Sequence, residues 1–191
     1  MTLHPELTDA AGATALVVDH VTPAELSAGT PCGEWDVRTL LNHVILWTSH
    51  SLERRAHGES AAPELMERDF AAEPDFAAAY RAQLDRALDA WADPAVWDRE
   101  LDVMGSKTPA ADVGALMIAE LVLHGWDLAA ATGQEYVVSD RAAGAALRAV
   151  EANAELFRQY KGFAEPVPTA AGAPVLDRVL AESGRNPAWT R

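Results

Sequence analysis

The most constraining stretch of the chain is residues 117–131, MIAELVLHGWDLAAA, which is largely apolar yet carries two acids and a histidine. A helix turns about 100° per residue, so Glu120 and His124 share one face, and Asp127 continues the same stripe. Leucine, valine and alanine occupy most of the remaining circumference, which predicts a helix buried in a core. Acidic side chains are seldom buried without a partner. We therefore expect a cation to face this stripe.

The rest of the composition favours an all-α protein. Alanine is frequent and strand-forming runs are few, while 49% of the residues are apolar and 23% are charged, as in ordinary soluble domains. A chain of 191 residues is long enough for one good core and short for two. Neither an internal repeat nor a linker is apparent. We therefore expect residues 1–191 to form a single helical domain.

Charge and cysteine content narrow the classes of partner. The formal net charge is −14, from 15 basic and 29 acidic residues, and no cluster of Lys or Arg is present that would neutralise phosphates. Nucleic acids and acidic membranes are therefore not expected partners. The single cysteine, Cys32, rules out an internal disulfide and a cysteine-rich metal site. With no signal-peptide pattern and no uninterrupted apolar run of about 18 residues, we expect a cytoplasmic monomer or homodimer that binds small molecules.

Helical periodicity predicts five longer helices and a short closing one, over residues 5–21, 36–56, 74–92, 110–132, 141–160 and 173–183. Asp36 is expected to cap the second helix, and Gly133 to end the fourth. Thr108 is expected to cap that fourth helix with Pro109 at its first position. The intervening stretches are expected to be loops or irregular, with at most single helical turns.

A second polar residue lies in an apolar stripe of the predicted helix 36–56. His43 shares a face with Leu40, Val44 and Trp47. Helix bundles commonly build metal sites from side chains on facing helices. His43, Glu120 and His124 would offer two imidazoles and a carboxylate, a set that suits Zn²⁺ and leaves a position open for water or substrate. Fe²⁺, Ni²⁺ and Mn²⁺ suit the same donors.

Each of these residues also has a simpler interpretation. His43 fits a core histidine bonded to a carbonyl, and Glu120 with His124 fits an i,i+4 hydrogen-bonded pair. Asp127 is either a second-shell acceptor that fixes the tautomer of a ligand imidazole, or a cap for a backbone group. Glu120, His124 and Asp127 would also fit a buried polar network around an arginine, without a metal. His50 lies about 10 Å along the helix axis from His43, too far to share one ion.

The remaining polar and aromatic residues are assigned simpler roles. Cys32 is expected to be a small buried side chain. Arg38 and Arg55 flank the helix of His43 as the local cations that an anionic thiol or acid would need, although both are expected to be solvated. The tryptophans near the site are expected in the core and the other histidines at the surface: Trp35, Trp47, Trp126, His4, His20 and His57. No hydrolase elbow, dinucleotide fingerprint or P-loop pattern is present.

Three segments carry a family resemblance: TPCGEWDVRTLLNHV, AELVLHGWDLAAATGQ and the closing PVLDRVLAESGRNPAW. Together they resemble the mycothiol-dependent maleylpyruvate isomerase N-terminal family of the DinB-like metal-binding superfamily. The resemblance implies a DinB-like four-helix bundle with additional short helices and a divalent metal in the bundle core. Matched motif by motif, the family's metal-binding residues fall on His43, Glu120 and His124.

The resemblance also implies a chemistry. The metal of the isomerase is thought to hold the thiol of its cofactor as thiolate, which then adds to an unsaturated substrate. It further implies a mycothiol-type cofactor and a metal-dependent thiol transferase or isomerase acting on a small electrophile. A non-catalytic, stress-linked metal- or ligand-binding module is the alternative. The isomerase has a further C-terminal domain that contacts the substrate, for which this chain lacks the length, so the resemblance does not extend to the maleylpyruvate reaction itself.

Overall fold

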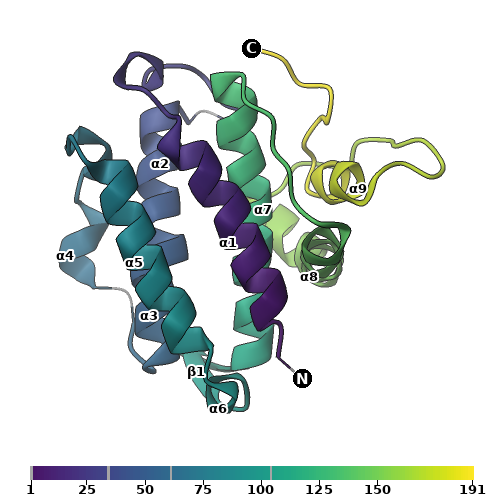
Figure 1. Ribbon diagram of the computed structural model, residues 1–191. Helices are drawn as coiled ribbons and strands as arrows, with labels where there is room; N and C mark the ends of the chain where they lie inside the picture. The colour runs from purple at the N-terminus through teal and green to yellow at the C-terminus, as the bar shows by residue number, and fades with distance from the viewer. Residues whose placement is uncertain (1, 34, 61, 104) are drawn as a thin grey trace.

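The protein is described by a computed structural model that covers residues 2–33, 35–60, 62–103 and 105–191. Its core is a bundle built from α1, the continuous helix α2–η2–α3, α5 and α7 (Figure 1). Within it α1 packs against α5 and α7, α2 packs against α7, and α3 packs against α5. The bounds of these elements are α1 His4–Asp19, α2 Val37–Ile45, η2 Leu46–His50, α3 Ser51–Ala56, α5 Phe76–Trp91 and α7 Ala110–Thr132. The predicted all-α bundle is confirmed.

The predicted helix over residues 36–56 contains a π turn that its periodicity did not indicate. Asp36 caps the helix by accepting a hydrogen bond from the Thr39 amide at 2.8 Å. The turn is η2, where the Thr48 and Ser49 hydroxyls donate to the carbonyls four residues earlier, at 2.7 and 2.6 Å. Hydroxyls that bond back in this way occupy carbonyl oxygens and bend or widen a helix. The adjacent Thr48 and Ser49 thus support the wider turn.

Short elements connect the bundle helices. The stretch predicted to be irregular holds an antiparallel hairpin, in which β1 residue Leu101 pairs with β2 residue Thr108. The predicted helix 110–132 is confirmed, but its predicted cap was wrong, because Thr108 belongs to the hairpin and Pro109 is the N-cap of α7. A buried Leu101 explains why so polar a segment forms a hairpin at all. The short elements are η1 Pro23–Glu25, α4 Pro63–Met66, η3 Phe70–Ala72, α6 Pro94–Trp97, β1 Glu100–Val103 and β2 Ser106–Pro109.

Two further helices cover one side of α7. The helix α8 (Asp140–Gln159) packs against α7 and α1, and α9 (Val175–Glu182) packs against α8, so both lie on the side of the bundle away from α5 (Figure 1). By length and hydropathy alone α7 would be able to cross a membrane, but 72% of its most apolar window is buried inside the protein. This helix is thus the central core helix of the bundle.

Gly125 allows α1 and the segment after α7 to approach α7 closely. The Thr14 hydroxyl and the Tyr136 hydroxyl both donate to the Leu121 carbonyl, at 2.9 and 3.2 Å. A Cβ atom on Gly125 would lie 2.5 Å from Thr14 Oγ1 and 2.7 Å from the Tyr136 ring. Close packing therefore requires glycine next to His124.

We expect Gly125→Ala to lower the free energy of unfolding by about 1–3 kcal/mol, because the added methyl overpacks a filled contact. The control is Gly12→Ala on the exposed side of α1, where an added Cβ meets nothing within 4 Å. Its higher helix propensity should stabilise the protein by up to about 1 kcal/mol. Urea unfolding measures both, and equal stabilities of the two variants would contradict this packing.

Candidate metal centre

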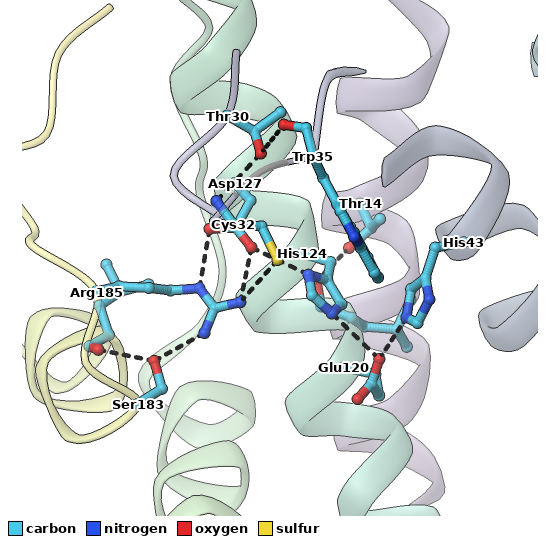
Figure 2. Close-up of polar contacts among 12 residues, drawn as sticks. Thr14, Thr30, Cys32, Trp35, His43, Glu120, His124, Asp127, Ser183 and Arg185 are labelled. Carbon is cyan, nitrogen blue, oxygen red and sulfur yellow. Dashed lines mark hydrogen bonds and ion pairs between the residues drawn. The ribbon is translucent and has the colours of Figure 1, made fainter. Parts of the chain in front are cut away.

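Two helices bring three potential ligands to one point. His43 extends from α2, while Glu120 and His124 extend from α7 one turn apart (Figure 2). The Glu120 Oε2 atom lies 3.1 Å from His43 Nε2 and 3.4 Å from His124 Nε2. The two imidazole rings meet edge to face with centroids 4.8 Å apart. The three side chains predicted to cluster therefore do so, and their role as metal ligands stays a prediction.

The geometry of the three donors fits a small divalent ion. One donor atom from each residue lies within 4.8 Å of the others. Ligands at about 2.0–2.1 Å from a tetrahedral Zn²⁺ stand about 3.3 Å from one another. The two measured separations between imidazole nitrogen and carboxylate oxygen are close to this value. Three protein donors leave a fourth position for an exogenous ligand, as in catalytic zinc sites.

A second layer of polar residues holds His124 from behind. Its Nδ1 lies 3.0 Å from Oδ2 of Asp127, a carboxylate that is completely buried. Arg185, which comes from the C-terminal segment, donates to both oxygens of this carboxylate, at 2.9 and 2.8 Å (Figure 2). Because the ionised Asp127 accepts the Nδ1 proton, the neutral form of His124 would carry its lone pair on Nε2, the nitrogen that faces Glu120. Within the described part of the chain Asp127 thus bonds to His124 and Arg185 and to no backbone group, and its role beside a metal ligand stays a prediction.

The loop before α2 supplies the third side of the site. The Thr30 hydroxyl donates to the Trp35 carbonyl at 2.9 Å and accepts from the Cys32 amide at 3.1 Å, which folds the loop toward α7. The Trp35 ring then lies 4.9 Å from the His43 ring and stacks on His124 at 6.1 Å. Cys32 Sγ lies 4.0 Å from an Arg185 nitrogen and shares a possible ligand cluster with His124 and Asp127. Cys32 is thus half-buried beside the site, whereas a fully buried small side chain was predicted.

Burial and neighbouring charges set the protonation states of the metal-free site. Burial disfavours the charged form of Glu120, but His124 and His43 outweigh it and hold the pKa of this carboxyl well below its ordinary value. For Asp127, burial is likewise outweighed by Arg185 and His124, which lower its pKa. Burial lowers the pKa of His124, but the opposite effect of Glu120 and Asp127 is larger. The pKa of His124 therefore lies well above its ordinary value. In the metal-free site these two carboxylates therefore favour the protonated form of His124.

This protonation predicts that metal binding competes with protons. Since a ligand imidazole must be neutral, we expect Zn²⁺ affinity to fall about tenfold for each pH unit below the raised pKa of His124. We also expect binding at about pH 7 to release at least one proton. Calorimetry in buffers of different ionisation enthalpy measures both quantities. An affinity that stays constant between about pH 5.5 and 7.5 would contradict the assignment of His124 as a ligand.

The structure differs from several other predictions made from the sequence. His50, predicted to lie too far from His43 to share its ion, is half-buried, stacks on Phe70 at 5.2 Å and lines a cavity that none of the three candidate ligands lines. Trp35 and Trp47 are half-buried against His43, whereas they were predicted in the core. Arg185 was not singled out at all. An arginine was expected only in general terms, as the partner of Glu120, His124 and Asp127 in a buried polar network.

Comparison with known proteins identifies the family. Residues 7–129 match the model of the mycothiol maleylpyruvate isomerase N-terminal domain. The chain belongs to this family. The matched region includes all three candidate ligands and Asp127, while α8, α9 and Arg185 lie beyond it.

Some known proteins resemble this member of the mycothiol maleylpyruvate isomerase family in sequence, and others resemble it in fold. Uncharacterized proteins from two strains of Mycobacterium tuberculosis, CDC 1551 / Oshkosh and ATCC 25618 / H37Rv, are each 29% identical over 178 residues, covering 91% of this chain and 92% of theirs. The crystal structure of the mycothiol-dependent maleylpyruvate isomerase matches with a TM-score of 0.60 at 20% identity, covering 80% of this chain and 69% of that one. A histidine-to-alanine mutant of that enzyme gives 0.59. The predicted DinB-like fold is thereby confirmed.

Proposed function

We propose that the protein is a divalent-metal-dependent enzyme that uses a low-molecular-weight thiol of the mycothiol type. The enzyme either transfers this thiol to a small electrophile or uses it to isomerise the electrophile. The observation that carries this proposal is the meeting of His43 Nε2 and His124 Nε2 at one oxygen of Glu120. An open three-ligand site is typical of catalytic rather than structural zinc. Membership of the isomerase family supports the same chemistry.

In this proposal each residue of the site has its own role. His43, Glu120 and His124 would hold the ion, and Asp127 keeps the Nδ1 proton on His124 so that Nε2 is free to ligate. A divalent ion held there would lower the pKa of a bound thiol and so supply thiolate at neutral pH. The Trp35 ring stacks on His124 and lies tilted against His43, so it bounds one side of the site.

A cavity next to His43 offers space for a small molecule. Its volume is about 410 Å³, within the range of ligand pockets, and aromatic and aliphatic side chains form much of its wall. The exposed fractions of the His43 and Glu120 side chains are 23% and 33%, so both remain accessible from solvent. The residues that line the cavity are Trp35, Arg38, Thr39, Asn42, His43, Leu46, Trp47, Leu65, Met66, Glu67, Arg68, Asp69 and Phe70.

The test is a thiol-addition assay on Zn²⁺-loaded protein with mycothiol as thiol, and diethyl maleate or maleylpyruvate as electrophile. Formation of the thioether adduct reports transfer, and conversion of the cis to the trans alkene reports isomerisation. We expect His43→Ala to lower the rate at least about 100-fold, because the ion loses a ligand. His50→Ala, two turns further along the same helix, should stay within about twofold of the parent.

Two outcomes decide between enzyme and binding module. Loss of the rate on chelation and its return with Zn²⁺ would support the enzyme. Equal rates for the parent and His43→Ala would instead leave a non-catalytic metal- or ligand-binding module as the function.

A further inference from the structure

The π turn places a second functional group on the face of His43. Arg55 follows His43 by twelve residues, which on a regular α-helix would leave the two side chains about 120° apart. A π turn has about 4.4 residues per turn, so each of its residues rotates about 18° less than in an α-helix. Over the five residues of η2 this brings Arg55 to within about 30° of His43. Both side chains therefore face α7.

Contacts fix where the Arg55 guanidinium lies. Its central carbon lies 5.5 Å from the centroid of the Trp47 ring, and Nη1 lies 2.9 Å from Met117 Sδ. Trp47 precedes Arg55 by eight residues, so the side chain extends back along the helix toward the site. Trp47 in turn lies 6.3 Å from the His43 ring. Met117 precedes Glu120 by three residues, about 4.5 Å along α7.

The guanidinium is half-buried and lacks a strong acceptor. Among the residues that the structure describes, no carboxylate lies within 4.0 Å of Arg55, and its one side-chain hydrogen bond goes to a thioether, a weak acceptor. Its neighbour Arg54, by contrast, pairs with Glu59 at 3.0 Å and donates to the Ser60 carbonyl at 2.6 Å. A guanidinium carries five N–H donors in a fork that matches a carboxylate. Arg55 thus retains donors for an exogenous anion.

Electrostatics agree with this geometry. Burial lowers the pKa of Arg55 from its ordinary value, and Glu120 partly restores it, so the side chain stays charged. Because the chain has a formal charge of −14, it would repel an anionic ligand in general. A cation fixed beside the site, such as Arg55, would offset this repulsion.

We propose that Arg55 binds a carboxylate of the substrate, so that the proposed thiol enzyme selects small unsaturated carboxylic acids over their neutral analogues. This inference rests on the proposed function. Stacking on Trp47 holds the guanidinium in place before the ligand arrives, and the planar fork then accepts the carboxylate in two hydrogen bonds. Arg55 is in this sense the specificity-determining residue of the site.

The test uses probes that carry a thiol and a carboxylate on one short chain. Co²⁺-loaded protein is titrated with 3-mercaptopropionate and 4-mercaptobutyrate, and with the corresponding neutral amides. Thiolate-to-Co²⁺ absorption reports thiol binding at the metal, and its dependence on concentration gives the dissociation constant. We expect the better acid to bind about 10- to 100-fold more tightly than its amide.

Arg55→Met should weaken the binding of the acid, while the affinity for the amide stays within about twofold of that of the parent protein. The preference for the acid over the amide should therefore fall to about onefold or below. Arg54→Met makes the same charge change on a side chain already paired with Glu59, and should keep the preference.

Failure of this inference is distinguishable from failure of the proposed function. If acids and amides give the same absorption and equal affinity, Arg55 does not bind carboxylate although the thiol chemistry stands. If Arg55→Met weakens acid and amide equally, the guanidinium only balances the charge of Glu120, which also overturns the inference. If no probe gives thiolate absorption, the thiol-binding metal itself is wrong.

Discussion

Glu120→Gln is expected to lower Zn²⁺ affinity by more than about 100-fold, because a neutral amide replaces the one anionic ligand between two imidazoles. The Glu120 carboxylate also stabilises the protonated form of His124 in the metal-free protein. Its removal should therefore lower the pKa of His124, and the proton release on metal binding should decrease. Competition with a chelating dye, at fixed pH, measures the affinity.

The control for this variant is Glu135→Gln, which removes the same charge from an exposed position. It should leave the affinity within about twofold of the parent, since solvent and salt largely screen an exposed charge that makes no contact with the ligands. If Glu120→Gln also retains an affinity within about threefold, the carboxylate is not a ligand and the contacts of Glu120 are those of a structural ion pair.

The second large effect is expected on stability. Asp127→Ala removes the partner of Arg185, whose guanidinium is buried and donates to both oxygens of this carboxylate. Leaving a buried charge uncompensated costs about 3–5 kcal/mol. We expect the free energy of unfolding of metal-free Asp127→Ala, measured with urea in the presence of EDTA, to fall by that amount. Loss of the His124 orienter should also reduce Zn²⁺ affinity about 10- to 100-fold.

The double variant Asp127→Leu/Arg185→Met separates these two roles. Replacing a buried ion pair by apolar side chains of similar size is often neutral for stability. We therefore expect the double variant to recover most of the lost free energy of unfolding while its Zn²⁺ affinity stays low. Recovery of both would mean that Asp127 acts only through packing, and would contradict its role in orienting His124.

What the sequence predicted well depends on rigid helical spacing. Glu120, His124 and Asp127 lie within one regular helix, so their common face follows from the rotation per residue alone. That His43 meets them required the additional premise that two apolar helix faces pack together, which an α-helical bundle supplies. The arrangement of the three candidate ligands therefore follows from periodicity and burial.

What the sequence did not predict depends on contacts between distant segments. Arg185 is 58 residues from Asp127, beyond a proline-rich connection, and no local pattern marks it as a buried partner. Cys32 and Trp35 reach the site through a loop shaped by the Thr30 hydroxyl, a turn that periodicity does not describe. The π turn is accompanied by hydrogen bonds from the Thr48 and Ser49 hydroxyls to carbonyls four residues earlier. The presence of Thr and Ser in a helix does not by itself predict a π turn. Hence Arg55 was expected in solvent and lies instead against Trp47.

The convergence of His43, Glu120 and His124 predicts a bound ion, and elemental analysis of the protein tests this most directly. The protein should be purified without a His-tag or chelating resin, so that any metal found was retained by the chain itself. About one divalent ion per chain is expected, as for other three-ligand sites of this donor set. Less than about one ion per ten chains, even after incubation with Zn²⁺ and desalting, would contradict the metal centre.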